Sequence, residues 1–322
     1  MRHRFFLVFR DQSGATAFEE EVTDFRALYH DVAFRAICAG ARANDGMWGD
    51  MLVEPVRREG NLAGVTVRVG DLSRTYGLTV FADQVSELLV RHYAREQREL
   101  DEDRPRWEGS TIVRHADVEE EMVRRHASVR RAPYPLIERA QCSVTLPDPE
   151  PNGNRVSLLI ASRLVADLKE ESAASLEEER ADFLTGYVVR ERGGTASVVV
   201  LDRIAADADT TRSLVHFGFS AQTFAAAQRA LETRGTDQVI AGWHHSHPPP
   251  CGRKCLMAVP ACETDNLFFS LADRRVHRSG FNSPYMVALV NGKGGKRRAD
   301  DPVLRGFGWR NGTIRARTFT VF

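Results

Sequence analysis

The stretch GWHHSHP, residues 242–248, follows an apolar run and leads into three consecutive prolines. Side chains alternate between the two faces of a β-strand, so His245 and His247 are expected to share one face and His244 to point to the other. Two imidazoles on one face can hold a single divalent ion, and the prolines would fix the path by which the chain leaves the strand. The stretch therefore predicts a strand whose end carries either a metal site or polar histidines without an ion, and further residues must separate the two.

A carboxylate follows at Asp273, three residues after Ser270. Two histidines and one aspartate leave a fourth position open for water, which is typical of catalytic rather than structural zinc. A simpler interpretation of the same four residues is a helix N-cap at Ser270. Asp265 is a competing carboxylate, but it has no serine three residues before it.

An acidic run at residues 177–179 ends in Glu179, seven residues before Gly186. Such a run is usually a solvated helix face. Glu179, then the His-Ser-His-Pro at 245–248, then Ser270 and Asp273, resemble in that order the motif of the JAMM (MPN-plus) metalloproteases. The resemblance covers residues 141–322.

This resemblance implies that His245, His247 and Asp273 hold a zinc ion, which lowers the pKa of a bound water to about 7. It also implies that Glu179 acts as the general acid and base, and that Ser270 stabilises the oxyanion. Members of the family hydrolyse isopeptide or peptide bonds after the C-terminus of ubiquitin or a ubiquitin-like protein.

The fold expected from the pattern and the resemblance is α/β. Residues 141–322 would form a JAMM-type domain with a curved mixed sheet flanked by helices, residues 1–100 a small α+β domain for partner recognition, and residues 101–140 a charged connector. Within the larger domain, helical spacing predicts a helix over 157–172, and residues 141–146 resemble a strand.

The spacing between His247 and Ser270 is 22 residues, positions 248–269, where the family has a shorter spacing, so this segment contains an insertion. A structural zinc site would stabilise such an insertion. The thiolates would come from Cys251, Cys255 and Cys262, and the fourth ligand from His244, His277 or Cys142. The alternative is that the cysteines are reduced and packed as small apolar side chains.

The chain has 44 basic and 44 acidic residues, and this zero net charge predicts neither a nucleic-acid nor a membrane partner. Its five cysteines are an odd number in a long chain, which disfavours a disulfide framework. The basic and apolar N-terminus has too short an apolar run for a signal peptide. We therefore expect a cytoplasmic protein.

The leading hypothesis is a bacterial zinc isopeptidase of a ubiquitin-like conjugation or antiphage defence system. Its partners would be a ubiquitin-like protein with its conjugates, together with activating and conjugating enzymes of the same operon. Two alternatives remain open: a peptidase that matures a sulfur-carrier protein, and a non-catalytic scaffold of the MPN type.

Overall fold

The computed structural model describes residues 2–40, 51–96, 110–118, 134–147, 156–174, 180–206, 211–213, 216–247, 267–293 and 302–322. It divides into two compact units. The first comprises Met1–Ile37, Ala41–Pro133 and Asn311–Thr313, and the second comprises Cys38–Gly40, Tyr134–Arg310 and Ile314–Phe322. The expected boundaries at residues 100 and 140 remain predictions.

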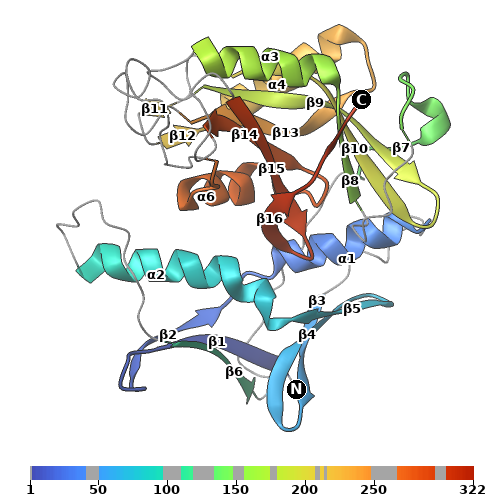
Figure 1. Ribbon diagram of the computed structural model, residues 1–322. Helices are drawn as coiled ribbons and strands as arrows, with labels where there is room; N and C mark the ends of the chain where they lie inside the picture. Colours follow the sequence, from blue (N-terminus) through green and yellow to red (C-terminus); the bar gives the residue numbers. More distant parts are fainter. Residues whose placement is uncertain are drawn as a thin grey trace. The chain divides into compact units, whose positions relative to one another are not determined.

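The described residues of the first unit form two antiparallel three-stranded sheets and two α-helices (Figure 1). One sheet has the order β2 (Thr16–Val22), β1 (Arg2–Arg10), β6 (Ser110–Val118), and the other the order β3 (Met51–Arg58), β4 (Asn61–Val69), β5 (Leu72–Gly77). The helices are α1 (Arg26–Cys38) and α2 (Ala82–Glu96), with a 3-10 turn, η1 (Leu78–Phe81), before α2.

Strand β6 lies within the segment expected to be a charged connector. It pairs with β1 along nine positions, from Arg10↔Ser110 to Arg2↔Val118. Its side chains from Ser110 to His115 alternate between exposed and half-buried, as a strand with one covered face requires. The high charge of the flanking residues obscured this short alternation in the sequence.

The second unit is built on a nine-stranded mixed sheet. Its order is β16 (Thr313–Arg317), β15 (Pro302–Arg310), β14 (Val287–Lys293), β13 (Val239–Ser246), β9 (Ala181–Glu191), β10 (Thr195–Ala205), β8 (Val156–Ile160) and β17 (Thr320–Val321). The ninth strand, β7 (Leu136–Glu138), pairs in parallel with β9 beyond the positions that β13 occupies. Strands β11 (Thr211–Ser213) and β12 (His216–Gly218) form a separate pair.

Helices α3 (Ser162–Ala174) and α6 (Leu271–Gly280) lie on opposite faces of this sheet, and α4 (Ala221–Arg234) packs near β13 (Figure 1). The expectation of an α/β chain with a mixed sheet flanked by helices is confirmed. Among the described residues no helix is both long and apolar enough to cross a membrane.

Two expected elements of this unit are wrong. The helix predicted over 157–172 is strand β8 followed by α3, with Ala161 between them. The strand predicted over 141–146 is the end of a 3-10 turn, η3 (Arg139–Gln141), followed by residues without regular structure. A short apolar run fits a buried strand and a buried helix equally well, and only pairing partners distant in sequence separate the two.

Strand β13 is the centre of the site. It runs antiparallel to β9 and parallel to β14, so both of its edges are paired. At Gly242 a side-chain carbon would lie 1.8 Å from the Val287 carbonyl oxygen. The glycine therefore lets β13 approach β14 closely, just before the histidines.

Candidate metal centre

At the end of β13, consecutive histidine side chains point to opposite faces of the sheet, as side chains alternate along a strand. His245 lies on the face of α6, and His244 lies on the opposite face beside Asp182. Ser246, between the two histidines of the motif, accepts a hydrogen bond from the Arg180 backbone N–H at 3.0 Å. The Ser246 backbone N–H donates in return to the Arg180 carbonyl oxygen at 2.9 Å. The serine between the two histidines thus ties β13 to the start of β9.

Asp273 is placed by the start of α6. The Ser270 hydroxyl oxygen accepts a hydrogen bond from the Asp273 backbone N–H at 3.1 Å. The Asp273 carboxylate accepts one from the Ser270 backbone N–H at 2.6 Å. These two bonds form a capping box, which satisfies two of the free N–H groups at the helix start. Ser270 is therefore the N-cap of α6. The same hydrogen bonds fix the carboxylate of Asp273, which faces the histidines.

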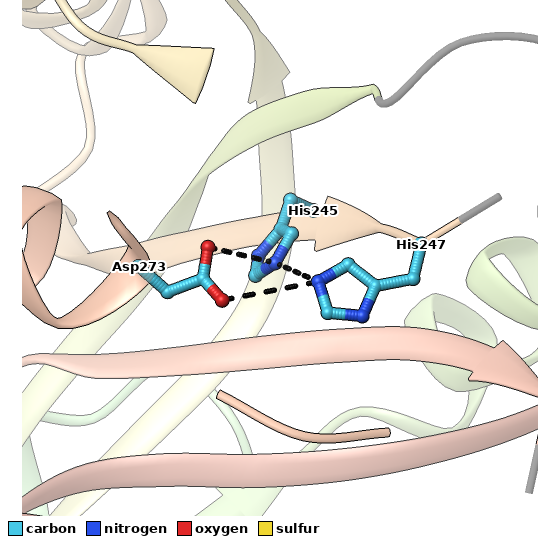
Figure 2. Close-up of side chains that lie close together, drawn as sticks. All are labelled: His245, His247 and Asp273. Atoms are coloured by element: carbon cyan, nitrogen blue, oxygen red, sulfur yellow. Dashed lines mark hydrogen bonds and ion pairs between the residues drawn. The ribbon is translucent and has the colours of Figure 1, made fainter. Parts of the chain in front are cut away.

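His245, His247 and Asp273 converge on one point (Figure 2). One donor atom from each lies within 4.8 Å of the others. The two Nε2 atoms are 2.8 Å apart, and the carboxylate oxygens lie 3.3 Å from His245 and 3.8 Å from His247. Ligands of a tetrahedral ion at bond lengths near 2.1 Å would be separated by about 3.4 Å, a value that these distances bracket. The group can therefore bind a metal ion.

The charge of the group also suits a cation. The side chain of His245 is fully buried, while those of His247 and Asp273 are 9% and 12% exposed. Burial alone would raise the pKa of Asp273, but the interactions with His245, Ser270 and His247 outweigh it and hold that pKa well below its usual range. Asp273 is therefore an anion at neutral pH, in a pocket that largely excludes water.

A second His–Asp pair lies on the opposite face of β13. His244 Nδ1 is 3.1 Å from the Asp182 carboxylate, which also accepts a hydrogen bond from Arg203 at 2.8 Å. Burial would raise the pKa of Asp182, yet the hydrogen bonds and charges of His244 and Arg203 lower it overall. The sequence suggested His244 as one of three possible fourth ligands for a cysteine site; its Nδ1 faces Asp182, while its Nε2 has no hydrogen-bond partner among the described residues, so this role stays a prediction.

Several predicted residues fall outside the described ranges. They are the general base Glu179, the competing Asp265, and the cysteines of the insertion, Cys251, Cys255 and Cys262. Cys142 is described and is a partly exposed free thiol. The second zinc site therefore stays a prediction. Within the described part of the chain, His245, His247 and Asp273 are the residues grouped closely enough for a metal.

Two residues of the site were not identified as such from the sequence. Trp243 stacks on His245, with ring centroids 4.6 Å apart and planes inclined by 13°. Its indole N–H donates to His277 Nδ1 at 3.0 Å. Their spacing from the ligands could have identified them: Trp243 lies two residues before His245 on the same strand face, and His277 lies one helical turn after Asp273.

The burial of His277 predicts a pH dependence of stability. Burial, aided by the charge of Arg274, lowers the pKa of His277 to about 3 from its ordinary value of 6.5. In the unfolded chain His277 therefore becomes protonated below about pH 6.5, whereas in the folded chain it stays neutral down to about pH 3. The free energy of unfolding therefore falls as the pH falls through this window. For the metal-free protein we expect a loss of about 2 kcal/mol between pH 7 and pH 5 from this residue.

Urea denaturation at both pH values measures this loss, with His277→Gln as the comparison. The variant lacks the titrating group, so its stability should change less between the two pH values. Equal changes in both proteins would show that His277 titrates normally.

Comparison with protein-family models and with curated protein sequences finds no match. Among solved structures, the chain is similar to the solution structure of protein DSY2949 from Desulfitobacterium hafniense, at 18% identity and a TM-score of 0.34. That similarity covers 51% of this chain and 92% of the other. The chemistry available to this chain must therefore be argued from its own residues.

Proposed function

We propose that the protein is a zinc-dependent isopeptidase or peptidase of the JAMM type, which cleaves after the C-terminus of a ubiquitin-like protein. The observation that carries the proposal is the buried group of His245, His247 and Asp273, at the junction of a strand end and a helix start. These are the three positions that the motif assigns to zinc. Two neutral imidazoles and one carboxylate are also the ligand types that zinc prefers.

Each side chain has a role that its surroundings support. His245 and His247 would hold the ion through nitrogen, and the Asp273 anion would offset part of its charge. When bound, zinc would supply a Lewis acid that activates water at neutral pH and polarises the scissile carbonyl. The Ser270 hydroxyl oxygen accepts the Asp273 N–H, and its own proton would be donated to the oxygen of that carbonyl.

The proton transfers are assigned to Glu179 from the resemblance. Its carboxylate would take a proton from the attacking water and deliver it to the nitrogen of the leaving amine, so that water adds across the broken amide bond. The described residue that follows it, Arg180, is tied by two hydrogen bonds to Ser246, between the histidine positions: its N–H donates to the Ser246 hydroxyl, and its carbonyl oxygen accepts from the Ser246 N–H. This link between the start of β9 and the metal group supports the assignment.

The test is a cleavage assay on ubiquitin-like proteins, each fused through its last residue to a fluorescent protein. The panel should include a sulfur carrier, because maturation of such a carrier would use the same site. Mass spectrometry locates the cut. We expect cleavage directly after the ubiquitin-like C-terminus, loss of cleavage with 1,10-phenanthroline, and recovery when zinc is added back.

Cleavage that survives both metal removal and the His245→Ala substitution would contradict the proposal. Zinc content per chain, measured on the same preparation, separates the two predicted sites. A value near one that falls to zero in His245→Ala would leave the cysteines of the insertion metal-free. A value near two would support the structural site.

A further inference from the structure

The ring of Trp243 lies between a proposed metal ligand and a buried histidine of α6. On one side it stacks on the imidazole of His245, with centroids 4.6 Å apart. At its edge, Nε1–H donates a hydrogen bond to His277 Nδ1 at 3.0 Å. All three side chains have no exposed surface. Strand β13 and helix α6 are thus joined twice, by this contact and by the approach of His245 to Asp273 at 3.3 Å.

The stacking of Trp243 on His245 matters because of the second ring nitrogen of His245, Nδ1. A metal-bound histidine usually donates its second ring N–H to a carboxylate, a carbonyl or water, and this bond fixes the orientation of the ring. In His245, Nε2 faces His247 and Asp273. Nδ1 is buried and has no hydrogen-bond partner among the described residues. Among the described rings around His245, Trp243 is the one that stacks face to face on the imidazole, and this contact resists rotation of the ring.

Trp243 can limit that rotation only if its own ring is held. Phe281 packs almost parallel to it, at 5.7 Å and 19°, which fixes its plane but not its rotation within that plane. The hydrogen bond to His277 fixes the rotation, because it requires the indole N–H to point at one atom. His277 accepts through Nδ1, so it must be neutral with its proton on Nε2. The low pKa of about 3 that burial gives His277 keeps it in this form at neutral pH.

We propose that Trp243 and His277 are positioning residues for the metal centre: His277 holds the indole, and the indole face holds His245 with Nε2 directed at the ion. The inference rests on the proposed metal site. In this proposal, ring stacking orients His245, as a second hydrogen bond does in most histidine ligands. Helix α6 then positions both His245, through His277 and Trp243, and Asp273.

Zinc affinity is the measurement, made by competition with a chromophoric chelator on the full chain. His277→Leu removes the acceptor, Trp243→Phe removes the donor but keeps an aromatic face, and His277→Asn keeps an acceptor at the place of Nδ1. Loss of an outer-shell partner typically costs about 10–100-fold in metal affinity. We expect losses in this range for His277→Leu and Trp243→Phe, and affinity close to wild type for His277→Asn.

Cobalt substitution adds a readout that a loss of stability alone would not change. The visible spectrum of bound Co²⁺ reports ligand geometry, so it should shift in His277→Leu and return toward wild type in His277→Asn. Thermal unfolding of the metal-free proteins identifies any variant that fails to fold. Trp243→Phe keeps the test available if His277→Leu is such a variant.

The outcomes separate the two proposals. If wild type binds zinc and His245→Ala does not, while folded His277→Leu and Trp243→Phe bind it as tightly as wild type with an unchanged cobalt spectrum, only the positioning role is overturned. If wild type and His245→Ala bind zinc equally, the metal site itself is wrong and the positioning role falls with it. Weaker binding in His277→Leu that His277→Asn does not restore also overturns the role assigned to the acceptor.

Discussion

Asp273→Asn is expected to abolish both zinc binding at the His245–His247 pair and cleavage of the fusion proteins. The substitution keeps the shape of the side chain, and the amide oxygen can still accept the Ser270 backbone N–H that is bonded to Asp273 at 2.6 Å. The start of α6 should therefore survive, while the anion that faces the two imidazoles is lost. We expect zinc affinity to fall by more than the roughly 100-fold upper range for outer-shell partners.

Asp182→Asn is the matched control for this experiment. It also removes a buried carboxylate beside a histidine of β13, but on the opposite face, where Asp182 contacts His244 and Arg203. We expect a stability loss of roughly 1–3 kcal/mol from the weakened buried hydrogen bonds, with zinc content unchanged. Zinc lost in Asp182→Asn and kept in Asp273→Asn would place the ion on the wrong face for the proposed chemistry.

Glu179→Gln is expected to keep zinc but to lower the rate of cleavage by about 10²–10⁴-fold, the range typical of a removed general acid or base. Glutamine has the same length but cannot take a proton from water at neutral pH. Zinc should stay bound because the three ligand side chains are intact. The rate is measured with excess enzyme in a single turnover, so that substrate release does not mask the chemical step.

Glu178→Gln controls for the charge of the acidic run. It removes one negative charge from the neighbouring position, and it should cut at the wild-type rate. Equal rates for Glu179→Gln and wild type would remove Glu179 from the mechanism. A fall in Glu178→Gln as large as in Glu179→Gln would mean that the run acts through its summed charge.

The sequence predicted the residues of the His245, His247 and Asp273 group, because the direction of each side chain on its own strand or helix follows from local geometry. Alternation along a strand placed His245 and His247 together and turned His244 away. The Ser270-x-x-Asp273 spacing suited an N-cap, while the resemblance implied an oxyanion donor at Ser270, and the structure contains the cap. The cap explains why a carboxylate at this spacing can serve as a ligand, since the same two hydrogen bonds that begin α6 also aim the side chain.

What could not be predicted depends on contacts between segments distant in sequence. The apolar run of β8 became a strand because it pairs with β10, 40 residues later at Val156↔Ala196. The contact of Trp243 with His277 needs the packing of α6 on β13, which no local pattern specifies. The signals for β6 were present but weak, because a few alternating residues compete with a long charged stretch.

The two adjacent histidines of β13 have a consequence for how the strand finds its alignment. A slip of one residue in either direction would place Ser246 where one of the two ligand histidines belongs, and it would set Trp243 or His245 against the buried Asp182. Trp243 there would leave that carboxylate without its imidazole, and the opposite slip would deny Asp273 both of its histidines. The order His-His-Ser-His is asymmetric, so only one alignment gives both Asp182 and Asp273 their histidine partners. A misaligned strand is destabilised, because a buried carboxylate loses its histidine.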